Sequence, residues 1–156
     1  MHLLYQSNPN SILLTSSFSE ILISANRLSE ANQILEQALR LNPDNAPLSM
    51  LLARSFQLDE RFSEAQKILW EQTRLRPNDA DVWYQLAEIS GLAGEVIDVH
   101  RARAEYFVLH GAYQNAVQHL QYARSIIDKN NDYLVLRLDQ RIIDLRAEEE
   151  ANRRAG

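Results

Sequence analysis

Apolar residues recur along the chain at the three- and four-residue spacing of a helical face, and no long stretch alternates as a strand would. Leu134, Leu138, Ile142 and Leu145 show this spacing near the end of the sequence. The pattern predicts an all-α protein. The expected helices span residues 12–25, 29–41, 46–58, 62–75, 80–92, 96–109, 113–127 and 132–150.

Three proline turns divide the first half of the chain at a constant interval. The interval is 34 residues, both from Pro9 to Pro43 and from Pro43 to Pro77. Asn or Asp follows each proline. Proline ends a helix and a neighbouring Asn or Asp caps the next one, so each turn separates two repeats. Thirty-four residues is the period of tetratricopeptide (TPR) helix hairpins. The sequence therefore predicts a right-handed superhelical solenoid of such hairpins.

The period is interrupted once in the second half of the chain. Ala31 and Ala65 are 34 residues apart, but the next equivalent small residue, Ala116, follows Ala65 by 51, which is one and a half periods. We therefore expect one irregular half-repeat. The predicted organisation is a single domain over residues 1–156. It comprises the end of a truncated upstream repeat (1–11), regular repeats (12–45 and 46–79), irregular repeats that share a helix (80–130), a capping helix (131–150) and a frayed tail (151–156).

Side-chain size along the repeats predicts the core. Small residues are expected where two helices of a hairpin cross closely, because a larger side chain would overpack the crossing. These are Ser19, Ala53 and Ala87, opposite Ala31 and Ala65. The large residues Leu52, Phe56, Trp83 and Leu86 are expected to fill the space between helices.

Composition excludes several classes of function. The chain has 16 basic and 21 acidic residues, a net charge of -5, and no basic stripe, which argues against nucleic acid as a partner. It has no cysteine, which excludes thiol nucleophiles, disulfides and Cys-rich zinc sites. No apolar run approaches the roughly 18 residues of a membrane span.

No catalytic or cofactor motif occurs in the sequence, so we expect no enzymatic activity and no cofactor in this chain. His100, His110 and His119 fall in the irregular half, but no two of them have the four-residue spacing of a helical metal site. His110 precedes Gly111 at a predicted helix end, where an imidazole can bond the last carbonyls. His100 and His119 are interpreted as surface or groove residues.

The remaining candidate site is the face formed by the first helix of each hairpin, which in such stacks binds protein or peptide segments. Its side chains combine Met, Tyr and Arg with carboxylates and can contact apolar groups as well as either charge. Counting in register along the repeats predicts a partner-binding groove made of Ser16, Glu20, Met50, Arg54, Gln57, Tyr84, Glu88, Arg101 and Glu105.

The irregular half also carries a family resemblance. The segments 83–94, 100–106 and 111–116 resemble the carboxyl-terminal TPR domain of bacterial M48 metallopeptidases, in particular the periplasmic, BepA-like members that assist β-barrel assembly. The resemblance implies a periplasmic location, an upstream peptidase domain that holds zinc, and contact with the outer-membrane protein assembly machinery. None of the zinc ligands of that family is present in this chain.

Two other interpretations stay open from the sequence. The chain could be a free-standing TPR adaptor or scaffold without a protease, because repeat arrays recombine readily. An independent hydrolase that uses the histidines is the least favoured interpretation. Neither the partner nor the oligomeric state follows from the sequence.

Overall fold

The computed structural model describes residues 11–128 and 132–155, and it consists of two compact units, Met1–Leu75 (unit 1) and Arg76–Gly156 (unit 2). The truncated repeat predicted for residues 1–11 lies almost wholly outside the described residues. Every described element is an α-helix. Unit 1 contains α2 (Ile12–Ser24), α3 (Leu28–Leu41), α4 (Ala46–Leu58) and α5 (Phe62–Leu75). Unit 2 contains α6 (Ala80–Leu92), α7 (Val96–Leu109), α8 (Tyr113–Ile126) and α9 (Asp132–Ala155).

The helix boundaries agree with the sequence pattern to within one residue, except at the end of α9. This helix continues to Ala155, five residues beyond the predicted end. Two ion pairs with four-residue spacing support its last turns, Arg153 with Glu149 and Arg154 with Glu150. Asn152 also donates a hydrogen bond of 2.8 Å to the Tyr113 hydroxyl at the start of α8.

Polar residues around the proline turns cap the helices that follow, as predicted. The Asn45 side chain accepts a hydrogen bond of 3.1 Å from the backbone N–H of Leu48 at the start of α4. Asp79 accepts from the N–H groups of Asp81 and Val82 at the start of α6. These oxygens satisfy donors that the first helical turn leaves without a partner.

The turns within hairpins show the repeat and its interruption directly in the backbone. Each contains one residue with positive φ: Asn26 (57°), Glu60 (56°), Gly94 (78°) and Gly111 (72°). The first three are 34 residues apart, whereas Gly111 follows Gly94 by only 17. Helix α7 is therefore preceded and followed by the same kind of turn. It is the second helix of a hairpin with α6 and the first helix of a hairpin with α8.

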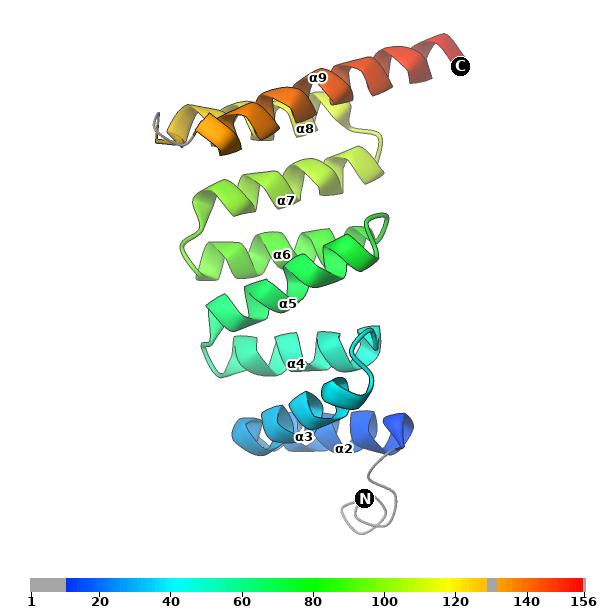
Figure 1. The fold of residues 1–156 in the computed structure, drawn as a ribbon, viewed down its shortest axis with the longest axis vertical. Helices are drawn as coiled ribbons and strands as arrows, with labels where there is room; N and C mark the ends of the chain where they lie inside the picture. Colours follow the sequence, from blue (N-terminus) through cyan, green and yellow to red (C-terminus); the bar gives the residue numbers. More distant parts are fainter. Residues whose placement is uncertain (1–10, 129–131, 156) are drawn as a thin grey trace. The chain divides into compact units, whose positions relative to one another are not determined.

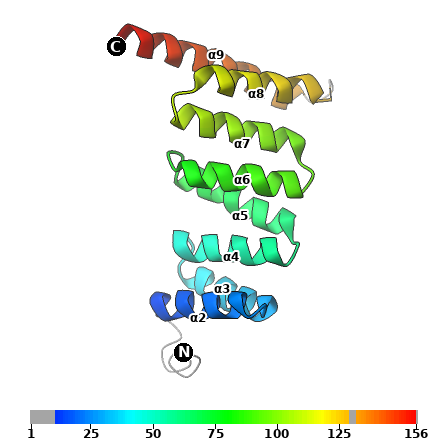
Figure 2. The same cartoon turned by 180° about the vertical axis from the view of Figure 1, so that it is seen from behind.

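The two units arrange their helices differently. In unit 1, α2 and α4 pack on each other in one layer, and α3 and α5 form the other layer (Figure 1). In unit 2, α7 packs on both α6 and α8 and separates them, so these three helices form one layer, with α9 against α8 (Figure 2). The predicted fold class is confirmed: an all-α TPR-type fold with one irregular half-repeat.

The core follows the predicted pattern with one exception. The small residues Ser19, Ala31 and Ala65 are completely buried. The large residues Leu52, Phe56 and Leu86 are at most 5% exposed. The prediction that Trp83 fills the core is wrong, because its side chain is only half buried. The buried stripe of α6 instead runs through its neighbour Val82, which is 2% exposed. The indole N–H of Trp83 donates a hydrogen bond of 2.7 Å to the carbonyl oxygen of Pro77.

Candidate functional site

Unit 2 contains a pocket of about 260 Å³ to which three successive helices contribute. Helix α6 supplies one aromatic wall and α7 supplies two more, while α8 closes the pocket with an imidazole. The pocket is lined by Tyr84, Ala87, Glu88, Arg103, Tyr106, Phe107 and His119. The single-layer packing of α6, α7 and α8 places these side chains together.

The aromatic rings form a continuous series across the three helices. The Tyr84 ring lies 5.9 Å from that of Tyr106 in a tilted arrangement, and Tyr106 lies 5.8 Å from Phe107, edge to face. Phe107 stacks on His119 with 5.3 Å between centroids and 23° between planes. These are the preferred separations of aromatic pairs, so the walls support one another without a bound partner.

The polar groups of the pocket carry both charges. Arg103 and Glu88 approach to 3.8 Å, and each side chain is about half exposed (48% and 49%). At this distance and exposure the ion pair is weak. The guanidinium and the carboxylate therefore remain able to bond polar groups of a partner, and together they give the pocket no net charge.

His119 also contacts His100 of α7, and the two Nδ1 atoms are 2.7 Å apart. The His100 ring packs at 4.4 Å on the ring of Tyr122. Burial lowers the pKa of His100, and the nearby Arg103 guanidinium lowers it further. Burial, the charge on His100 and the charge on Arg103 lower the pKa of His119. Both imidazoles are therefore neutral at pH 7.

The predicted groove residues of unit 2 divide into two groups. Tyr84 and Glu88 both line the pocket, and Tyr84 is 53% exposed. Arg101 instead pairs with Asp98 on its own helix at 2.8 Å. Glu105 is held by Arg141 of α9. The structure thus brings the α6 residues together at the pocket and places the two α7 residues elsewhere.

The predicted residues of unit 1 lie on α2 and α4. Arg54 and Gln57 are exposed on α4, and Met50 is half buried there. On α2, Glu20 is exposed, while the Ser16 hydroxyl donates to the carbonyl of Ile12 within its own helix.

A larger groove of about 550 Å³ in unit 1 lies away from these predicted residues, between α3, α4 and α5. Leu39, Leu52 and Ile68 contribute its apolar lining. Its lining also contains two acidic and two basic side chains: Glu36, Glu71, Arg40 and Lys67. This mixture favours no particular ligand chemistry.

Five lining residues of the unit 2 pocket are absent from the predicted groove. Ala87 is expected in the core, and the sequence interprets His119 only as a surface or groove residue. The other three lie on α7, where Arg103, Tyr106 and Phe107 together with His110 have the three- and four-residue spacing of one helical face. That spacing could have identified the face of α7 that lines the pocket. No local signal marks His119, because its contacts with Phe107 and His100 cross between helices.

The predicted role of His110 is confirmed. It is the C-cap residue of α7, and its Nδ1 lies 2.8 Å from the carbonyl oxygen of Tyr106. In the described part of the chain, no group of three or more His, Asp or Glu side chains is arranged to hold a metal ion. No helix within the same residues is long and apolar enough to span a bilayer.

Comparison with known proteins agrees with this fold. The model of the tetratricopeptide repeat family matches residues 22–89. The crystal structure of MamA is similar over 96% of this chain and 86% of its own, with 14% identity and a TM-score of 0.64. The MamA RS-1 ArsTM double mutant is similar over 95% of this chain and 82% of its own, with 15% identity and a TM-score of 0.63. No curated protein matches the chain.

These findings support a TPR-type repeat domain. At 14–15% identity the similarity to MamA shows the fold alone, and the family model assigns TPR repeats to residues 22–89 of that fold. Such repeat stacks are scaffolds that bind other proteins and are typically non-catalytic.

Proposed function

We propose that this chain is a non-catalytic protein-recognition module whose unit 2 pocket binds one large apolar side chain, preferably aromatic, of a partner peptide. The observation that carries the proposal is the pocket of about 260 Å³ with the aromatic walls Tyr84, Tyr106 and Phe107. The peptide chain itself would lie across the exposed surfaces of α6 and α7.

Pocket size favours a single side chain over a small-molecule ligand. Sites for small molecules and cofactors usually enclose about 300–1,000 Å³, and this pocket is smaller. An aromatic anchor gains about 0.5–1.5 kcal/mol from ring packing beyond the burial of its area. Large anchors in well-packed pockets also supply most of the binding energy in many interfaces.

Charged groups at the pocket favour a peptide with polar residues beside the anchor. Arg103 and Glu88 pair only loosely with each other, so an incoming peptide can bond either group without breaking a strong interaction. Because the two charges cancel, the pocket excludes neither an acidic nor a basic flanking sequence. Specificity then rests on the anchor.

The test is selection of peptides from a displayed library on the immobilised protein, followed by affinity measurement. Selected sequences are expected to share one aromatic or large aliphatic position. The Tyr84→Ala variant, which removes a half-exposed wall, should bind them at least about tenfold more weakly, a loss of roughly 1.4 kcal/mol. Tyr133→Ala is the matched control, since Tyr133 is 71% exposed on α9 and lies outside the pocket. Equal loss in both variants would refute the proposal.

The biological setting is a separate proposal. The resemblance of segments 83–94, 100–106 and 111–116 to M48 peptidases supports a periplasmic module that docks substrates or assembly factors for an attached zinc protease. Zinc would then bind only in that peptidase domain. The alternative is a free-standing adaptor with no protease.

The gene distinguishes these settings. If the module serves a peptidase, the coding sequence upstream of residue 1 will encode a signal peptide and His-Glu-x-x-His. An upstream region without that motif would favour the adaptor. Either result leaves the peptide-binding proposal for unit 2 intact.

A further inference from the structure

The contact between His100 and His119 requires that one, and only one, of the two facing Nδ1 atoms carries a hydrogen. Two Nδ1 atoms 2.7 Å apart form a hydrogen bond only if one carries a hydrogen and the other presents a lone pair. In the neutral pair, one histidine is therefore the Nδ1–H tautomer and the other is the Nε2–H tautomer. Two Nδ1–H groups cannot face each other at this distance.

The same contact fixes one wall of the unit 2 pocket. His119 lines the pocket and stacks on Phe107, which also lines it. His119 is also held by His100, whose ring packs on Tyr122. If the two histidines separate, His119 loses the partner that sets its ring orientation, and Phe107 loses its stacked neighbour.

We propose that the His100–His119 pair makes partner binding by unit 2 dependent on pH, because full protonation of the pair breaks the contact that forms one wall of the pocket. This inference rests on the proposed function, since it concerns the regulation of the same site. It predicts binding at neutral pH and its loss in acid.

Protonation of the pair proceeds in two steps with different consequences. The first proton can occupy a free Nε2, which leaves one Nδ1 lone pair to accept the hydrogen bond, so the contact survives. The second proton must occupy that lone pair, and then two cationic N–H groups oppose each other. The pocket therefore changes at the second step, which lies at lower pH than the first.

Burial and one neighbouring charge oppose both steps. Burial is the largest cause that lowers the pKa of both histidines, and Arg103, on the same helix as His100, lowers it further. From α6, Glu88 reaches this region through its 3.8 Å contact with Arg103, and from α8 the phenol of Tyr122 packs on His100.

Charged groups of α9 that reach α7 and α8 are held by other residues. Arg141 and Glu148 are joined to each other and to Glu105. Asp139 pairs with Arg124, and Glu149 accepts from Gln114. These interactions leave Arg103 as the charge that acts on the pair together with the histidines themselves.

The experiment uses N-acetyl-phenylalaninamide, a neutral probe that presents one aromatic side chain and does not titrate. Its affinity for the full chain is measured by NMR at pH 7.5 and at pH 4.5. We expect binding at pH 7.5 and at least about tenfold weaker binding at pH 4.5. His100→Asn should reduce this dependence, because an amide can turn to donate to neutral His119 or accept from its protonated form. His110→Gln removes the other imidazole near the pocket, which packs on Tyr106 at 4.3 Å, and should keep the dependence because the pair is intact.

The outcomes separate the two proposals. Failure of the probe to bind at pH 7.5 would contradict the proposed function. Binding that is equal at both pH values would overturn this inference alone.

A ligand-free measurement covers the case in which a variant does not fold. In the wild-type protein, the ring signals of Phe107, which stacks on His119, should shift together with the second titration of the His100–His119 pair. Ring signals that stay constant while both histidines titrate would also overturn the inference.

Discussion

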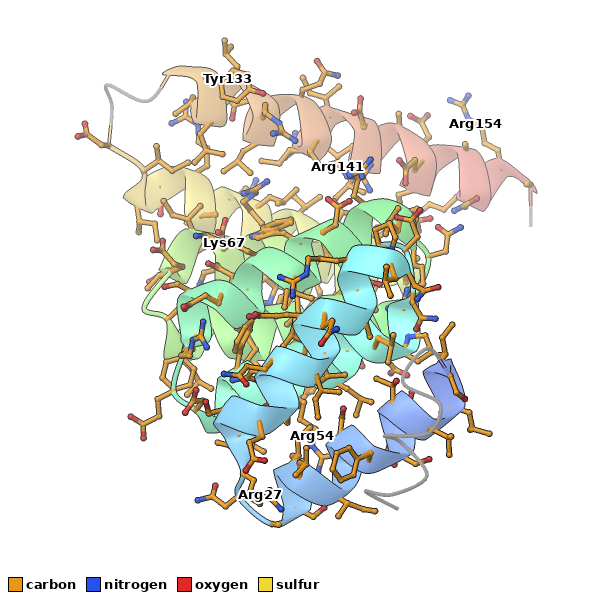
Figure 3. All side chains as sticks on the ribbon, turned by 60° about the horizontal axis from the view of Figure 1, so that its bottom comes forward. Arg27, Arg54, Lys67, Tyr133, Arg141 and Arg154 are labelled. Carbon is orange, nitrogen blue, oxygen red and sulfur yellow. The ribbon has the colours of Figure 1, made fainter. Side chains whose placement is uncertain are left out.

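The guanidinium of Arg141 in α9 makes two hydrogen bonds of 2.8 Å to the carboxylate of Glu105 in α7, one from Nε and one from Nη2. Its Nη1 donates a third, of 2.9 Å, to Glu148. Figure 3 shows Arg141 projecting from α9 toward the helices below it. These carboxylates raise the pKa of Arg141, and the largest cause is the hydrogen bonding that Arg141 donates to Glu105. The pair joins α9 to a helix that is not its neighbour in sequence.

Arg141→Met should therefore destabilise the docking of α9. Hydrogen bonds to charged partners contribute about 1.5–3 kcal/mol when shielded, and both side chains are at most 30% exposed. We expect the free energy of unfolding to fall by about 1–3 kcal/mol, measured by urea denaturation. Amide hydrogen exchange should accelerate in α9.

Arg124→Met is the matched control for this change. Arg124 also bonds a carboxylate of α9, Asp139, but the two side chains are 47% and 42% exposed. An exposed pair contributes about 0–1 kcal/mol. If Arg124→Met lowers the free energy of unfolding as much as Arg141→Met does, shielding of the ion pair from solvent has no role.

Glu60→Gly should stabilise unit 1. Glu60 adopts φ 56° in the turn between α4 and α5, at a position where two later turns have glycine. A non-glycine residue in this conformation costs roughly 1–2 kcal/mol of folding free energy, which glycine avoids. Glycine also has greater conformational freedom in the unfolded chain, which offsets part of this stabilisation. The free energy of unfolding should rise by about 0.5–1 kcal/mol. Asn26→Gly should have a smaller effect, because Asn tolerates this conformation; an equal gain would contradict the strain argument.

Ser19→Ala should also be stabilising. The Ser19 side chain is completely buried, and its hydroxyl has no hydrogen-bond partner. An unsatisfied buried polar group costs about 1–3 kcal/mol, and the equivalent positions Ala53 and Ala87 already carry alanine. Thermal unfolding should show a gain of about 1 kcal/mol. Ser16→Ala, which removes a hydroxyl bonded to Ile12, should give no gain; stabilisation of both variants would indicate helix propensity as the cause.

The stability of the folded protein should decline in acid through the histidine pair. The pKa values of His100 and His119 are lowered in the folded state, whereas an unfolded histidine titrates near 6.5. Below about pH 6.5 the unfolded chain therefore binds more protons, so the contribution of the pair is complete above that pH and is lost as the pH falls. The melting temperature, measured at pH 7.5, 6.5 and 5.5, should therefore fall as the pH falls. A His100→Asn, His119→Asn double variant should show a flatter profile, and an identical profile would refute the assignment.

Part of the pocket could be predicted and part could not. Tyr84 and Glu88 follow from the repeat register of α6, which α2 and α4 establish. The register could not be extended to α7, because this helix belongs to two hairpins and its orientation depends on both neighbours. Counting along it led to Glu105, which bonds α9, in place of Arg103. Trp83 was misplaced for a related reason, since its spacing is compatible with the stripe that Val82 occupies.

The sequence by itself determined the helices, their caps and the interruption of the 34-residue period, because these depend on local residue types and on spacing along one chain. The tertiary structure alone decided the aromatic pocket and the 2.7 Å contact between His100 and His119. Both require side chains from different helices to meet. Where they meet is set by the rotation of α7 between α6 and α8, which no local pattern specifies.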